Sequence, residues 1–348
     1  MDVRTAVEAR VGSGEVHGAA WLVDRAGDVT SGAAGITAPD TIFRISSVTK
    51  PVVAALAAQL VEQGLLSLDD PVDRLLPELA DRRVLRSPDG PIDDTVPADR
   101  PITVQDVLEF RLGLGMDFTG PFPGTVLGAL AELGMPVGPP APQAAPGPDE
   151  WMRVVGNVPL SHQPGARWLY NTGAQVLGVL VARAAGRPLP ELLAERLLDP
   201  LGMTDTGFHV PPDRLGRFGR QWLGSDVYDE PDGQWAAPPA FPDAAAGLVS
   251  TVADLHAFAA SLRTADPSWR TARHGDHGGG EGWGLGIGVK VVDLPDGRHA
   301  GTYGWDGGLG STWWTDPVTD TIAILLTTDA WTSPQPSAVF EDFWAAAF

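Results

Sequence analysis

Segments with strand character stand at both ends of this chain, and segments with helical character stand between them. Residues 18–36 alternate around an Asp-Arg-Ala-Gly-Asp turn, a pattern that predicts a β-hairpin. Residues 283–331 contain four further strand-like stretches, and an amphipathic helix over residues 337–348 closes the chain. Strands from both ends close most simply into one mostly antiparallel sheet. We therefore expect an α+β fold in which terminal helices flank the sheet and a helical region is inserted.

The length of the chain bears on its domain organisation. A chain of 348 residues is too long for one small core and forms either one large domain or two interlocked ones. We predict a discontinuous sheet domain of residues 1–60 and 245–348, and a mainly helical domain of residues 61–244. Within the helical part, residues 118–149 are rich in Pro and Gly, which favours a surface excursion or a lid over a site.

Local signals mark two of the helices. Residues 46–65 are apolar on nearly all sides, so we expect a buried helix with Ser46 as its N-cap and Gly64 at its C-cap. Thr103 occupies the N-cap position of a capping box that Asp106 completes.

Composition excludes several classes of function. The formal net charge of -20 disfavours contact with nucleic acid and with anionic membrane surfaces. The chain has no cysteine, which excludes disulfides and thiolate metal sites. The first residues lack the apolar run of a secretory signal, and no segment reaches about eighteen unbroken apolar residues. We therefore expect a cytoplasmic protein that binds neither nucleic acid nor membrane.

The chain contains only two lysines, Lys50 and Lys290. Lys50 follows Ser47 by three residues, so on a helix both side chains lie on one face. Serine needs a neighbouring base to act as a nucleophile, and lysine can be that base because burial lowers its pKa, whereas arginine stays protonated. The pair favours catalysis over the alternative of a capping serine beside a surface lysine. Because Pro51 has no N–H for the Ser47 carbonyl, we expect an irregular first turn.

The stretch FRISSVTKPVVAALAAQLVEQGLLSLDDPV resembles the nucleophile segment of the serine β-lactamase-like superfamily, which includes class C β-lactamases, DD-peptidases and family VIII carboxylesterases. The stretches ITVQDVLEFRLGLG, PGARWLYNTGAQVLGVLVARAAG, DPLGMTDTGF and AAGLVSTVADLHAFAASL extend the resemblance over nearly the whole chain. The resemblance implies a β-lactamase-like fold and a serine hydrolase that forms an acyl-enzyme on Ser47, with Lys50 as a catalytic residue and without a metal or organic cofactor.

The resemblance also places the family's Tyr-x-Asn motif in PGARWLYNTG. It implies that Tyr170 is the catalytic tyrosine, and it puts Thr172 in the substrate-binding position where relatives carry asparagine. A phenol can relay a proton between the serine and a leaving group, and a nearby ammonium favours the phenolate. The alternative is a half-buried core tyrosine with one hydrogen bond.

The family's last motif, Lys-Thr-Gly or His-x-Gly, corresponds here to Trp305, Asp306 and Gly307, which the resemblance implies are substrate-binding residues. It further implies an oxyanion hole made of the backbone N–H groups of Ser47 and Gly308, where glycine lets the backbone approach the tetrahedral oxygen. The alternative for the two glycines is a bulge or turn in a strand.

The identity of this last motif bears on the substrate. Penicillin-binding enzymes hold a substrate carboxylate with a cation at the position of Trp305, which carries no charge, and Thr172 removes an amide-binding group. We therefore expect a carboxylesterase whose substrate is a small neutral ester, or a small-molecule amide. The alternatives are a β-lactamase or D-amino-acid peptidase, an acyltransferase, and a non-catalytic binding scaffold of the same fold. The sequence leaves open the natural substrate, the oligomeric state, and whether Lys50 or Tyr170 is the first base.

One weaker signal concerns metals. The stretch HGDHGGGE contains His274, Asp276, His277 and Glu281, which are residue types that can bind zinc. The stretch is more typical of a mobile Gly-rich loop, so we expect no metal site.

Overall fold

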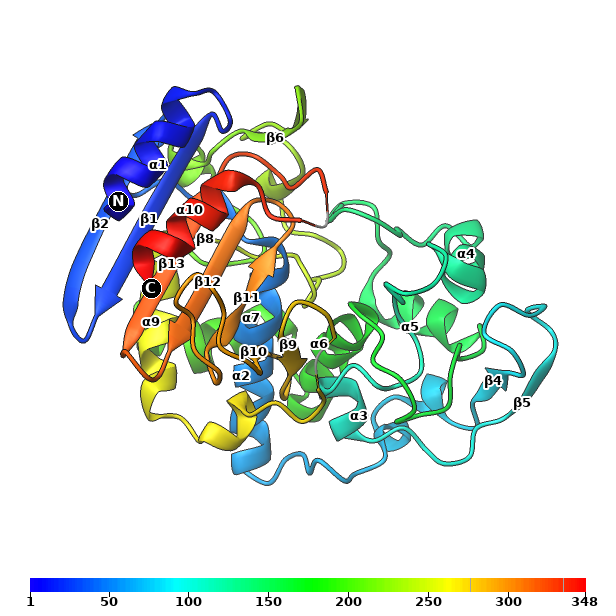
Figure 1. The fold of residues 1–348 in the computed structure, drawn as a ribbon. Coiled ribbons are helices and arrows are strands. Elements are labelled where there is room, and N and C mark those ends of the chain that lie inside the picture. Colours follow the sequence, from blue (N-terminus) through cyan, green and yellow to red (C-terminus); the bar gives the residue numbers. More distant parts are fainter. Residues whose placement is uncertain (276, 334) are drawn as a thin grey trace. The chain divides into compact units, whose positions relative to one another are not determined.

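The computed structural model describes residues 1–275, 277–333 and 335–348 (Figure 1). Contacts within the chain divide it into two compact units. The first unit comprises Met1–Val52, Ala194–Pro238 and Ala246–Phe348, and the second comprises Val53–Leu193 and Pro239–Ala245. Residues 194–238, which the sequence grouped with the helices, thus belong to the first unit.

The first unit contains the main sheet. In the described residues, seven strands pair antiparallel in the order β2-β1-β13-β12-β11-β10-β9. Their bounds are β1 Gly18–Arg25, β2 Asp28–Gly35, β9 Glu281–Trp283, β10 Gly288–Lys290, β11 Tyr303–Gly307, β12 Ser311–Asp316 and β13 Thr321–Thr327. Because β13 lies between β1 and β12, strands from both ends of the chain meet in one sheet, which confirms the predicted architecture.

The hairpin at the N-terminus follows from its turn residues. Arg25 pairs with Asp28, so β1 and β2 are joined by the two residues Ala26 and Gly27. Both have a positive φ, 51° and 95°, as the type I′ turn of a two-residue hairpin requires. The predicted hairpin over residues 18–36 is confirmed.

Helices cover both faces of this sheet. On one face, α1 (Val3–Gly12) and α10 (Ala338–Ala347) pack side by side (Figure 1), and their apolar residues form one core with Trp314 of β12. On the other face, α9 (Val252–Ser261) contacts β1 and β13, and its Phe258 packs edge-on against Trp313. Adjacent tryptophans of β12 therefore face opposite layers, as the pleat of a strand dictates.

Short elements complete the first unit. They are β3 Phe43–Arg44 paired with β8 Val249–Ser250, β6 Gln221–Leu223 paired with β7 Asp226–Asp229, and α8 Asp199–Leu201. Helix α2 (Thr49–Glu62) begins in the first unit and continues into the second. None of the helices in the described part of the chain has the length and apolar character that crossing a bilayer requires.

The second unit is mainly helical. Its elements are α3 Val104–Leu108, α4 Gly124–Glu132, α5 Pro148–Gly156, α6 Thr172–Ala185, α7 Leu189–Leu193 and the paired strands β4 Arg83–Leu85 and β5 Thr95–Pro97. The capping box predicted at the start of α3 is present: the Thr103 hydroxyl accepts from the Asp106 N–H, and the Asp106 carboxylate accepts from the Thr103 N–H.

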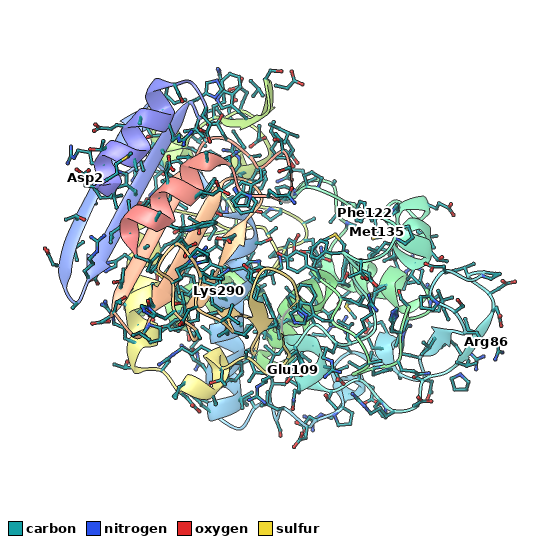
Figure 2. All side chains as sticks on the ribbon, viewed as in Figure 1. Asp2, Arg86, Glu109, Phe122, Met135 and Lys290 are labelled. Atoms are coloured by element: carbon teal, nitrogen blue, oxygen red, sulfur yellow. The ribbon has the colours of Figure 1, made fainter. Side chains whose placement is uncertain are left out.

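The Pro- and Gly-rich stretch 118–149 contains one complete helix, α4, which the composition did not reveal, and the first two residues of α5. Figure 2 labels Phe122 and Met135 beside this helix. Phe122 is 60% exposed, as expected for a surface excursion.

Candidate active site

Ser47 and Lys50 lie at the start of α2 in the first unit. A 3-10 turn, Ser46–Val48, leads directly into α2, and Lys50 Nζ donates a hydrogen bond to Ser47 Oγ over 2.8 Å. Lys50 is only 1% exposed, whereas Ser47 remains partly accessible. The three-residue spacing thus brings a hydroxyl and a buried amine together, which is the geometry that a serine nucleophile and its base require.

The turn before α2 corrects the prediction that Ser46 is the N-cap. Ser46 has a φ of +46°, in the left-handed region, and α2 starts only at Thr49. In the described residues no side-chain bond caps the 3-10 turn, whose N-cap is Ile45. A non-glycine residue in this region costs about 1–3 kcal/mol, and such strain is concentrated at functional sites. The expected irregular first turn is present as the 3-10 turn.

A buried serine on the sheet anchors this turn. Ser311 Oγ, at the start of β12, donates a hydrogen bond to the Ile45 carbonyl over 2.7 Å, and the Val48 N–H donates to the same oxygen over 3.1 Å. Ser311 could not be found from sequence, because its partner lies far away along the chain. The available signal was a small polar residue that follows a glycine at the start of a strand-like stretch.

The end of β11 lies directly against the nucleophile turn. A Cβ atom on Gly307 would lie 2.5 Å from the Ile45 carbonyl oxygen and 3.1 Å from the Ser47 nitrogen, so only glycine fits there. A Cβ atom on Gly308 would meet nothing within 4 Å. The Gly308 carbonyl accepts from the Trp331 N–H, and no described residue accepts from the Gly308 N–H. Glycine at position 307 therefore lets the two backbones approach each other, as an oxyanion hole requires.

The side chains of Trp305 and Asp306 make contacts within the first unit. The Trp305 ring packs edge-on against Trp283, with 4.7 Å between ring centroids, and covers Gly288, where a Cβ atom would lie 2.3 Å from the indole. The Asp306 carboxylate accepts hydrogen bonds from Thr312 and Trp314 of β12. Trp305 is partly exposed, and its predicted contact with substrate stays a prediction.

Tyr170 belongs to the second unit, where it precedes α6. Its ring lies among those of Phe110, Phe118 and Trp168, at centroid distances of 6.0, 5.3 and 5.6 Å. Its backbone exchanges two hydrogen bonds of 2.8 Å with Met116. The Tyr170 side chain is therefore fixed by its own unit and remains partly accessible.

The residue after Tyr170 is strained. Asn171 has φ 81° and ψ -59°, and the Thr172 N–H donates back to the Tyr170 carbonyl over 3.1 Å. These values describe the rare γ-turn with a positive φ. Thr172, predicted to bind substrate, is the buried first residue of α6. Because Tyr170 and Thr172 lie in the second unit, their approach to Ser47 stays a prediction.

The possible zinc ligands do not form a cluster in the described residues. Asp276 lies outside the described residues. Glu281 pairs with Lys290, the second lysine of the chain, which is 3% exposed and carries its Nζ 4.0 Å from the centroid of the Trp314 ring. Figure 2 labels Lys290 at the end of the sheet that contains β9 and β10.

Comparisons with known proteins point to one family. A family model described as Beta-lactamase matches residues 3–339. The chain is 36% identical to Protein Rv1367c of Mycobacterium tuberculosis, covering 82% of this chain and 77% of that protein. It is 31% identical to Esterase EstB of Burkholderia gladioli, covering 84% of this chain and 78% of the esterase.

Solved structures share the fold. The structure of EstCE1, a hydrolase with promiscuous acyltransferase activity, superposes with a TM-score of 0.83 at 24% identity and covers 99% of this chain and 97% of that one. A serine and a buried lysine lie at the start of α2, and Gly307 at the end of β11 packs against them. The chain belongs to the β-lactamase family, among the serine hydrolases of the serine β-lactamase-like superfamily.

Proposed function

We propose that this serine hydrolase is a carboxylesterase that acts on small neutral esters through an acyl-enzyme on Ser47. The observation that carries the proposal is the 2.8 Å hydrogen bond between Lys50 Nζ and Ser47 Oγ in a site that excludes water from the amine. A neutral amine in this position can accept the hydroxyl proton as Ser47 Oγ attacks the ester carbonyl. Lys50 takes that proton either directly or through Tyr170, and the activity of a Tyr170→Phe variant distinguishes the two routes.

The negative charge that develops on the carbonyl oxygen needs donors that are already in place. We assign this role to the backbone N–H groups of Ser47 and Gly308. Gly307 supports the assignment because its lack of a side chain lets β11 lie against the nucleophile turn. Donors that are fixed before the reaction need no reorganisation in the transition state.

The remaining steps release alcohol and acid. In the proposal, the Tyr170 hydroxyl protonates the leaving alcohol as the tetrahedral intermediate collapses to the Ser47 ester. A water molecule then attacks that ester and gives a proton to the Tyr170 phenolate, and the Lys50 ammonium returns its proton to Ser47 Oγ as the acid leaves. General acid–base catalysis of this kind contributes about 10²–10⁴-fold in rate.

Two arguments favour an ester over a β-lactam. Trp305 offers no charge for a substrate carboxylate, and its ring is packed against Trp283. The relative EstB, which covers most of this chain, is named an esterase. A β-lactamase or D-amino-acid peptidase is the alternative that the experiment must exclude.

Intact-mass spectrometry tests the proposal. Wild type and Ser47→Ala are mixed with p-nitrophenyl esters of increasing chain length and with a cephalosporin, and then quenched at short times. We expect an acyl adduct on the wild type from the esters only, and none on Ser47→Ala. An adduct formed by the cephalosporin alone would instead support the β-lactamase alternative, and no adduct from any donor would support a binding scaffold. Adding a primary alcohol separates hydrolysis from acyl transfer, because transfer produces a new ester.

A further inference from the structure

We propose that Asp306 is a positioning residue, which fixes the end of β11 so that the Gly308 N–H points at the carbonyl oxygen of the ester. The inference deepens the proposed function and rests on it. The family resemblance implied that Asp306 binds substrate. The contacts of its carboxylate instead lead away from Ser47, towards the layer that α10 forms on the sheet.

A chain of hydrogen bonds holds the Asp306 carboxylate. Its Oδ1 atom accepts from Thr312 Oγ1 and, over 2.8 Å, from Trp314 Nε1. Thr312 Oγ1 in turn accepts from Trp344 Nε1 of α10 over 3.2 Å. Thr312 and Trp314 are fully buried, and Trp344 is 5% exposed. Because the Trp344 indole can only donate, the single proton of the Thr312 hydroxyl goes to Asp306. The hydrogen bonds therefore run in one direction, from Trp344 through Thr312 to Asp306.

Among the described residues, the end of β11 is paired with a strand on one side only, so a side-chain bond to that strand can fix its position. In the described residues, β10 pairs with β11 at Tyr303 and Gly304 and goes no further. Residues 305–307 pair only with β12, where Asp306 lies directly opposite Thr312. The side-chain bond between this pair therefore adds a second attachment at the position just before the two glycines.

A displacement of the end of β11 would move the backbone that lies against Ser47. Gly307 lies against the Ile45 carbonyl and the Ser47 nitrogen with no room for a Cβ atom. Donors of an oxyanion hole act within about 2.7–3.1 Å of the oxygen, and a misplacement of about 1 Å can cost about 10²-fold in rate. An unanchored strand end would therefore weaken the hydrogen bonds that stabilise the transition state more than it weakens the binding of the uncharged ester.

The charge of Asp306 is not what the anchor needs. Burial raises the pKa of this carboxyl, and Glu281 acts in the same direction, while Lys290 and Arg298 oppose the rise. An asparagine has the same shape, and its amide oxygen can accept both donors in place of Oδ1. The conservative variant Asp306→Asn should therefore keep the anchor, whereas Asp306→Ala removes it.

Steady-state kinetics with p-nitrophenyl acetate test the inference. For Asp306→Ala we expect kcat to fall by about 10- to 100-fold with KM within about threefold, and for Asp306→Asn we expect both constants within about threefold of wild type. Asp24→Ala is the matched control, because Asp24 is a buried aspartate of the same sheet whose carboxylate likewise accepts hydrogen bonds, three in number. We expect it to lower the melting temperature and to leave kcat unchanged well below that temperature.

Further variants keep the test decisive. Circular dichroism checks that each variant is folded, and if Asp306→Ala is not, Thr312→Val and Trp314→Phe each remove one donor and should lower kcat by about 3- to 10-fold. An unchanged kcat in these folded variants, or an Asp306→Asn variant as slow as Asp306→Ala, would overturn the positioning role.

Labelling of Ser47 by a fluorophosphonate, measured in parallel, separates failure of the proposed function from failure of the positioning role. A wild type that neither hydrolyses the ester nor is labelled overturns the proposed function and this inference together, whereas an active wild type beside an equally active Asp306→Ala overturns the inference alone.

Discussion

Both lysines of this chain are buried, and they differ in their partners. Lys50 bonds the Ser47 hydroxyl, whereas Lys290 pairs with Glu281 and lies over an indole ring. We expect Lys50→Arg to lower kcat for an ester by about 10³-fold or more, because a guanidinium cannot accept a proton. Lys290→Arg keeps the charge of its ion pair, and its kcat should stay within about threefold of wild type. Equal losses in both variants would mean that Lys50 matters only for folding.

Gly307 permits a second test at the level of one residue. In Gly307→Ala the new methyl group would collide with the Ile45 carbonyl and with Ser311 Oγ, at 2.5 and 2.2 Å from the ideal Cβ position. Both atoms belong to buried hydrogen bonds, so the strand must move away from Ser47. We expect a loss of about 10²-fold in kcat together with a lower melting temperature. Gly308→Ala is the control for stability, because its Cβ atom meets open space. A Gly307→Ala enzyme with full activity would rule out the proposed oxyanion hole.

At the level of elements, the attachment of α9 to the sheet gives a pH dependence. Asp24 of β1 accepts hydrogen bonds from His256 and Arg263 in and after α9, at 2.9 and 2.8 Å. Burial alone would raise the pKa of Asp24, but the bonds from Arg263, His256 and the Gly27 N–H outweigh it and lower that pKa to about 2. The stabilisation is complete above the unfolded pKa of about 3.9 and is lost as the pH falls through the folded pKa.

Urea unfolding of Asp24→Asn checks this dependence. We expect the variant to be less stable than wild type by about 2 kcal/mol at pH 7, and this difference to shrink between about pH 4 and pH 2. Asp28→Asn, an exposed substitution in the same hairpin, should change the unfolding free energy by less than about 0.5 kcal/mol. A difference between wild type and Asp24→Asn that does not vary with pH would contradict the attribution to this carboxylate.

The sequence predicted those elements whose signals are local. The turn Ala26-Gly27 determines the first hairpin, and Thr103 with Asp106 determines the start of α3, because each signal lies within a few residues. Ser46 was misassigned because a capping serine and a strained serine look the same in sequence, and only packing against β11 and β12 decides between them. Helix α4 was hidden because the prolines and glycines around it dominate the composition of its stretch.

At the level of the whole molecule, the proposed chemistry needs residues from both units. Ser47 and Lys50 belong to the first unit and Tyr170 to the second. We expect Tyr170→Phe to lower kcat by about 10²-fold or more, because the phenol proton is lost while the ring remains for packing. Tyr228→Phe, on β7 of the first unit, is the matched control and should keep its kcat. If Tyr170→Phe retained full activity, the proton relay would have to be assigned to Lys50 alone.

The candidate site could be predicted from sequence only where its parts are short motifs. Ser47 and Lys50 share one helical turn, so their spacing indicated their contact. The bonds that fix Asp306 and Ser311 depend on strand register and on the pleat of β12, which no short motif encodes. The family resemblance supplied the position of Tyr170, whereas the γ-turn after it became visible only in the structure.

The insertion of the last strand between β1 and β12 has a consequence for synthesis on the ribosome. Ile45 and Ser311, whose hydrogen bond ties the nucleophile turn to the sheet, are 266 residues apart. A nascent chain released before β13 would leave β1 and β12 with open edges, which invite aggregation. We therefore expect that truncation even a few residues before the end of β13 abolishes both solubility and turnover, although every catalytic side chain has by then been translated.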